Sequence, residues 1–177
     1  PLADPFFVLA TQNPIEQEGT YPLPEAQLDR FMYQVWVDYP SFDQELEVLK
    51  QTTGSSAYTP KAVLTASDIR MYQKVVREVP VTDAVYQYVV SLVHKTRPDS
   101  DLADAETKKY VAYGAGPRAG QNLILGAKCH ALMNGKFSVD IEDVRAVAQW
   151  VLGHRVVRNF KAEAEGKSVK ELIANWY

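Results

Sequence analysis

The sequence is poor in cysteine and histidine, with a single cysteine, Cys129, and three histidines. One cysteine cannot form an internal disulfide, which fits a reducing compartment, so we expect a cytoplasmic protein. His94, His130 and His154 do not stand at metal-ligand spacing, and the neighbours Cys129 and His130 would point apart on a helix. The sequence therefore predicts no metal site.

Long apolar runs and a strong net charge are also missing. The longest unbroken apolar run, FFVLA at 6–10, is far shorter than the roughly 20 residues of a membrane-spanning helix and carries no basic leader. A formal net charge of −3 is too weak to draw the chain onto nucleic acid or an anionic membrane. We therefore expect a soluble protein with no membrane span and no nucleic-acid partner.

The composition is that of an ordinary globular chain, with 46% hydrophobic and 23% charged residues, so a packed core is expected. A length of 177 residues permits one domain, or one domain and a piece of another. The chain opens with Pro1, close to a strand-like run, which indicates a chain cut at its start.

The first 38 residues predict the end of an α/β domain. An apolar run at 6–10 and an aromatic and β-branched run at 31–37 are typical of strands, and 25–30 is long enough only for a short helix. Two strands alone do not make a stable sheet. We therefore expect a two-strand remnant of a larger core in 1–38, with its strands poorly paired within one molecule.

The remainder, 39–177, predicts a mainly α domain of five or six helices, with the boundary at Tyr39-Pro40. Asp140 and Asp143 predict the capped start of one of these helices. Apolar residues at helical spacing place the helices after Ser41 up to Gly54, over 69–79, 85–97, 117–134 and 141–151, and finally over 169–176.

Two residues near the start of the chain could act on a phosphate. Asn13 directly follows the apolar run, where its amide could orient a water molecule or a phosphate oxygen, although Asn13-Pro14 could simply form a turn. Arg30 closes the short helix, where its guanidinium could reach a phosphate on a neighbouring molecule. The plain alternative for Arg30 is a surface ion pair with Asp29 or Glu25.

A third candidate, Arg118, lies in the run GAGPRAG at 114–120, where glycines lead into a helix start and let another group approach closely. The alternative is an ordinary loop at the start of a helix. Two other patterns predict no site, because the acidic loop 99–106 lacks the glycine and terminal glutamate of an EF-hand and 135–138 lacks most of a P-loop. The basic cluster of His154, Arg155, Arg158 and Lys161 favours a subunit contact over DNA binding.

Taken together, FVLATQNP at 7–14, EQEGTYPLPEAQLDRF at 16–31 and YGAGPRA at 113–119 closely resemble the MoxR family of AAA+ ATPases. The resemblance implies that the chain is the end of a nucleotide-binding AAA+ core, 1–38, followed by a helical lid domain, 39–177. Gly116 departs from the pattern, because most relatives are expected to carry serine there.

This resemblance also implies roles for the three candidate residues. Asn13 matches the sensor 1 residue, Arg30 the arginine finger that acts on the ATP of an adjacent subunit, and Arg118 the sensor 2 arginine. The intact protein would use ATP and Mg²⁺, form a ring that is expected to be hexameric, and remodel partners or help mature metal cofactors. A von Willebrand factor A type protein is an expected partner.

The sequence contains neither a Walker A loop nor a Walker B acid pair. The 177 residues alone are therefore expected to bind no ATP or Mg²⁺ tightly and to be inactive. Two alternatives remain open, a non-catalytic interaction module derived from an AAA+ lid and a DNA-handling AAA+ relative. The second would need a basic face that the sequence does not show.

Overall fold

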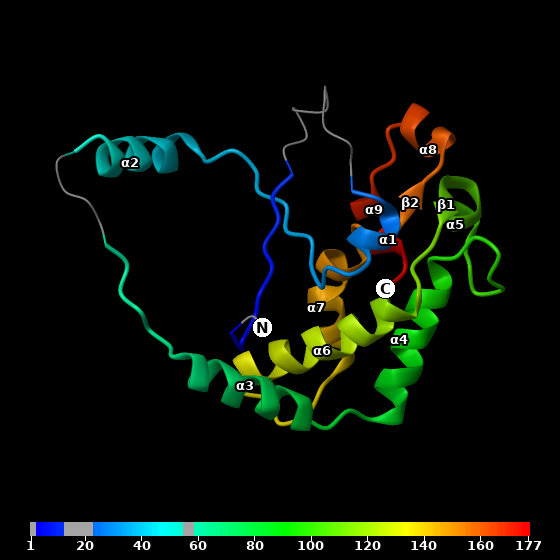
Figure 1. Ribbon diagram of the computed structural model, residues 1–177. Helices are drawn as coiled ribbons and strands as arrows, with labels where there is room; N and C mark the ends of the chain where they lie inside the picture. Colours follow the sequence, from blue (N-terminus) through cyan, green and yellow to red (C-terminus); the bar gives the residue numbers. More distant parts are fainter. Residues whose placement is uncertain (1–2, 13–22, 55–58) are drawn as a thin grey trace.

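The computed structural model describes residues 3–12, 23–54 and 59–177, and it consists mainly of helices (Figure 1). The mainly α fold class is thereby confirmed. The elements in chain order are α1 (Glu25–Leu28), α2 (Phe42–Thr52), α3 (Ala66–Glu78), α4 (Asp83–Lys95), α5 (Ala105–Tyr110), β1 (Val111–Tyr113), α6 (Pro117–Met133), α7 (Ile141–Leu152), β2 (Val157–Arg158), α8 (Phe160–Ala164) and α9 (Val169–Asn175).

The core lies where α6 packs along α7 and against α4. Small residues of α6 permit this close packing, since Ala119, Ala127 and Ala131 share one fully buried face with Leu123. The amphipathic end of the chain closes the core as expected. Trp176, directly after α9, is buried, and its Nε1 donates to Thr107 Oγ1 at 2.7 Å.

The start of α7 is fixed by the capping pair that the sequence predicted. Asp140 and Asp143 form a reciprocal capping box, and Asp143 is fully buried. The Asp143 carboxylate also accepts hydrogen bonds from His130 at 2.8 Å and Lys136 at 3.1 Å. Burial by itself would raise the pKa of Asp143, but the backbone N–H of Asp140 and these two side chains lower that pKa overall.

Two short strands and two short helices were not predicted. β1 and β2 pair antiparallel, with Val111 opposite Arg158 and Tyr113 opposite Val157. With α5 and α8 included, the described part of 39–177 contains eight helices rather than five or six. Elements of two to six residues are too short for a hydrophobic period to be visible in the sequence.

The two runs in 1–38 that were predicted as strands form no strand among the described residues, in keeping with the expectation that they pair poorly within one molecule. In the run 6–9 every side chain is more than half exposed, and no described segment pairs with it. The second run, 31–37, docks on α7 instead, because Gln34 N donates to Trp150 O at 2.9 Å. A β-rich run needs a neighbouring strand for its backbone groups, and neither run has one among the described residues.

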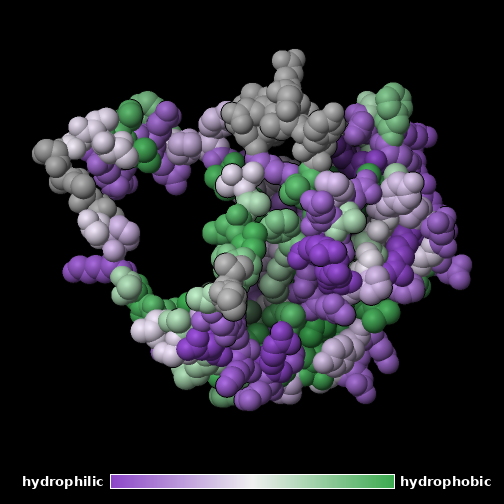
Figure 2. Space-filling model, in the orientation of Figure 1, coloured by the Kyte–Doolittle hydropathy of each residue, from purple (hydrophilic) through white to green (hydrophobic). Residues whose placement is uncertain are grey.

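Helices α2 and α3 form an arm, in which α3 packs against α6 and α2 extends away from the helical body (Figure 1). Neither helix buries a residue, although the apolar spacing of α2 is as predicted. Phe42 is 83% exposed, and the space-filling view shows apolar side chains of the arm open to solvent (Figure 2). Among the described residues, no helix is long and apolar enough to cross a membrane.

Candidate functional site

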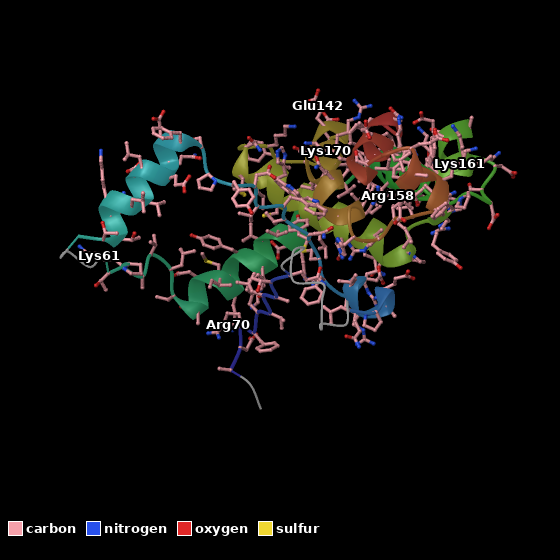
Figure 3. The ribbon with its side chains drawn as sticks, turned by 90° about the horizontal axis from the view of Figure 1, so that it is seen from above. Lys61, Arg70, Glu142, Arg158, Lys161 and Lys170 are labelled. Carbon is pink, nitrogen blue, oxygen red and sulfur yellow. The ribbon has the colours of Figure 1, made fainter. Side chains whose placement is uncertain are left out.

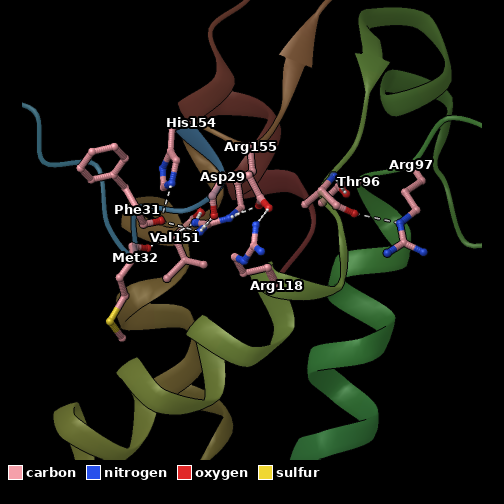
Figure 4. A network of polar contacts seen from close by, with 10 residues as sticks. Asp29, Phe31, Met32, Thr96, Arg97, Arg118, Val151, His154 and Arg155 are labelled. Carbon is pink, nitrogen blue, oxygen red and sulfur yellow. Dashed lines mark hydrogen bonds and ion pairs between the residues drawn. The ribbon is translucent and has the colours of Figure 1, made fainter. Parts of the chain in front are cut away.

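A turn that follows α1, residues 29–32, lies against the C-terminal end of α7 (Figure 4). Arg155, three residues after α7, holds this turn with a guanidinium whose side chain is only 1% exposed. Its Nε donates to Asp29 Oδ1 at 2.9 Å, and its Nη2 donates to Asp29 O at 2.8 Å and to Phe31 O. Its Nη1 donates to Met32 O at 3.3 Å and to Val151 O. All five N–H donors of this arginine are therefore used.

Asp29 lies between two arginines. While Arg155 holds Oδ1, Arg118 Nη1 donates to Oδ2, so the carboxylate bridges the end of α7 and the start of α6. Arg155 is buried, but Arg118 is 47% exposed at its side chain. Burial lowers the pKa of Arg155, and the hydrogen bond that Arg155 donates to the Asp29 carboxylate opposes that effect, so the buried charge is matched by its partner.

The loop in front of Arg118 is fixed by the end of α4. Ala115 N donates to Thr96 Oγ1 at 2.9 Å, and Arg97 Nε donates to Ala115 O at 2.9 Å. Gly114 packs so tightly that a Cβ there would lie 2.4 Å from Thr96 O, which is backbone and cannot yield. The loop therefore delivers Arg118 from the first turn of α6 in a defined direction.

The departure from the family pattern at Gly116 is sterically neutral, because a Cβ there would meet nothing within 4 Å. A serine would fit without any movement. Gly116 also lines a small cleft of about 160 Å³ beside Glu25, Asp29 and His154.

Arg30 projects from the turn and is exposed. Its backbone N donates to Gln27 O at 3.1 Å, and its side chain forms no hydrogen bond or ion pair with the part of the chain that the structure describes. The expected alternative, a pair with Asp29 or Glu25, is absent, since Asp29 is taken by the other two arginines. Asn13 lies outside the described residues.

His154 supports the same turn from the other side. Its Nε2 lies 3.1 Å from Phe31 O, and its Nδ1 is buried without a partner among the described residues. Burial lowers the pKa of His154, and the charge of Arg155 lowers it further, so the imidazole is neutral at pH 7. A neutral ring that donates from Nε2 leaves Nδ1 as the bare nitrogen.

The segment after the turn is anchored too. Tyr33 packs edge-to-face on Trp150, with ring centroids 6.0 Å apart. Its hydroxyl lies so close to α6 that a Cβ at Gly126 would come within 2.2 Å of it, which explains the glycine. Burial raises the pKa of Tyr33 to about 12.

Sequence reasoning missed Asp29 and Arg155 as a pair. Arg155 was predicted to belong to a basic cluster for subunit contact, but it is buried. Two other members of that cluster, Arg158 and Lys161, lie on the helical body, whereas Lys61 lies on the arm (Figure 3). Asp29 and Arg155 are 126 positions apart, so no local sequence pattern could indicate that they pair. The one sequence signal for the pair was that Asp29 lies next to Arg30 in the run DRF at 29–31. The described residues contain no group of three potential metal ligands.

Two known protein families match parts of this chain. Residues 103–176 match the AAA lid domain, and residues 1–33 match the ATPase family associated with various cellular activities (AAA). The class is therefore an AAA ATPase chain that carries a helical lid.

Individual proteins similar to this chain indicate which branch of the AAA ATPases it resembles. The chain is 40% identical to Chaperone MoxR1 of Mycobacterium tuberculosis over 99% of its own length and 46% of that protein. It is 38% identical to the uncharacterized protein YeaC of Bacillus subtilis, over 97% of its own length and 51% of that protein. A crystal structure of an ATPase candidate from Cytophaga hutchinsonii superimposes with a TM-score of 0.91 at 38% identity, covering 99% of this chain and 54% of that one.

The chain belongs to the MoxR-like AAA+ ATPases, as its motifs indicated. It spans about half the length of the curated relatives that it matches.

Proposed function

We propose that this chain supplies the lid and the nucleotide-responsive arginines of a MoxR-like AAA+ ATPase that hydrolyses ATP in the presence of Mg²⁺. In this proposal 1–38 belongs to the nucleotide-binding core and 39–177 to the lid. Arg30 acts as the arginine finger, Arg118 as the sensor 2 arginine, and Asn13 as sensor 1. Phosphoryl transfer is catalysed mainly by positioning and fixed positive charge, which suits these residue types.

The observation that carries the proposal is the gathering of two exposed arginines at one turn. Arg118 pairs with Asp29, and Arg30 projects from the next position in the chain. An exposed ion pair contributes only about 0–1 kcal/mol, so Arg118 can exchange Asp29 for a phosphate at little cost. Asp29 stays paired after the exchange, because Arg155 holds its other oxygen.

Magnesium is assigned no ligand among the described residues. The described residues hold no cluster of carboxylates, and Mg²⁺ in nucleotide sites is bound through one or two carboxylates and the phosphates themselves. The phosphate-binding loop and the metal-binding acid are expected elsewhere in the whole protein.

The wider role that we propose is remodelling of partner proteins in the cytoplasm by a hexameric ring. The name Chaperone MoxR1 of one relative supports the remodelling activity. Maturation of metal cofactors together with a von Willebrand factor A type protein is the more specific form of this proposal. A non-catalytic interaction module is the rival, and it predicts that the whole protein does not bind ATP.

The direct test is Arg30→Ala in the whole protein, with steady-state ATP hydrolysis and ATP affinity measured side by side. A finger supplied in trans is worth roughly 10³–10⁵ in turnover, so hydrolysis should be abolished while ATP binding persists. Lysine should rescue little, because it lacks the planar fork. Arg77→Ala, an exposed arginine on α3, is the matched control and should keep full turnover. Near-normal turnover of Arg30→Ala would overturn the finger assignment.

A further inference from the structure

The hydrogen bonds of Arg155 single it out from the other lid residues. Four of its five side-chain hydrogen bonds reach the turn 29–32, and only one, to Val151 O, stays within its own helical body. A guanidinium that merely stabilised the lid would bond to lid groups. This one joins the lid to the segment that carries Arg30.

The backbone on both sides of Arg30 is held by a single atom. Nη2 of Arg155 donates to the carbonyl oxygens of Asp29 and Phe31, the two neighbours of Arg30 in the chain. Phe31 O also lies 3.1 Å from His154 Nε2. The Arg30 backbone is thus fixed to the end of α7, while its side chain remains exposed.

The same carboxylate that Arg155 holds is contacted by Arg118 from the start of α6 (Figure 4). A change at Arg118 therefore reaches the Arg30 turn through one residue, Asp29. The start of α6, the end of α7 and the turn 29–32 are thus joined by continuous polar contacts. Arg155 has no N–H left to form a different set of hydrogen bonds, because all five are already used.

We propose that Arg155 is a positioning residue for Arg30, which makes the arginine finger move with the lid, and that Asp29 connects this unit to Arg118. The proposal rests on the proposed function of Arg30 and Arg118. Binding of phosphate by Arg118 releases one oxygen of Asp29, and the lid then carries Arg30 as a fixed extension of α7. Nucleotide state in one subunit thereby sets the finger that this subunit presents to its neighbour.

The test uses the whole protein with Arg155→Lys and Asp29→Asn. Lysine keeps the charge but has three donors on one nitrogen, so it cannot span four acceptors in the turn. Arg158→Lys is the matched control, because Arg158 donates to Lys167 O at 2.8 Å and to no group of the turn. For each variant, kcat, ATP affinity and amide hydrogen exchange of residues 30–34 are measured.

We expect both variants to lower kcat roughly 10- to 100-fold, as misplacement of a catalytic group does. ATP affinity should be unchanged in Arg155→Lys and no weaker in Asp29→Asn, where Arg118 no longer has to leave a carboxylate. Exchange should accelerate in 30–34 and stay slow in α6. The double variant Arg30→Ala with Arg155→Lys should be no slower than Arg30→Ala alone, because two residues that act as one unit are not additive. Arg158→Lys should match wild type.

Other outcomes separate the two proposals. If Arg30→Ala abolishes turnover but Arg155→Lys and Asp29→Asn keep it, the positioning role is wrong and the finger stands. Multiplied losses in the double variant would also overturn it. If Arg155→Lys unfolds the lid, the test rests on Asp29→Asn, and an unchanged kcat in that variant would overturn the proposal. If Arg30→Ala itself keeps turnover, the finger assignment fails and this inference fails with it.

Discussion

At the scale of single residues, Arg118 differs from Arg155 by exposure more than by chemistry. Both bind Asp29, but Arg118 is 47% exposed and Arg155 is 1% exposed at its side chain. A half-exposed pair contributes little to folding and exchanges easily, whereas a buried guanidinium with five acceptors is fixed. The exposed arginine is therefore the one suited to respond to a ligand.

Replacement of Arg118 by alanine should leave the lid folded. Loss of a surface pair costs about 0–1 kcal/mol, so thermal unfolding of the whole protein should shift by no more than about 4 °C. Coupling between nucleotide and lid should weaken, which hydrogen exchange of α6 and α7 with and without ATP would measure. A lid that melts after this one change would show that Arg118 serves packing.

His154 gives the turn a dependence on pH. Its folded pKa lies below the ordinary 6.5, because burial and Arg155 oppose its charge, while Asp29 and the carbonyl of Phe31 favour it only in part. As pH falls below 6.5 the unfolded chain takes up a proton that the folded chain does not, so the free energy of unfolding decreases. His154→Gln should lose less thermal stability between pH 7.5 and 5.5 than wild type. Equal losses would contradict the depressed pKa.

At the scale of elements, the sequence predicted what local chemistry determines. The start of α7 followed from Asp140 and Asp143, because a capping pair acts within one helical turn. The helix predicted over 85–97 ends as α4 at Lys95, shortly before Pro98, because a proline disfavours helical geometry in the residue before it. The runs 6–10 and 31–37 failed as strands, because a strand depends on a partner that local sequence does not contain. The helices α5 and α8 were missed because they are too short to show a hydrophobic period in the sequence.

The same distinction applies to the site. Arg30 and Arg118 were predicted because they stand in motifs, and the family match supports those motifs. Arg155 was not, because its role depends on a contact across 126 residues that only the packed lid creates. The roles of Asn13, Arg30 and Arg118 stay predictions until they are tested in the whole protein.

At the scale of the whole molecule, the proposed reaction needs two subunits, because the finger of one acts on the ATP of the next. Such contacts are heterologous, with the pocket of one subunit against a different face of its neighbour. Subunits with Arg30→Ala keep an intact pocket, and subunits with a disabled P-loop lysine keep an intact finger. Each kind of subunit alone should be inactive.

An equal mixture of the two should regain activity. With random assembly, about a quarter of the interfaces join an intact pocket to an intact finger, so hydrolysis should rise to roughly that fraction of wild type if sites act independently. The measurement is turnover of the mixture after subunit exchange, with each variant alone and unmixed rings as controls. A finger that acted within its own subunit would leave every mixture inactive, because no subunit would then carry both groups.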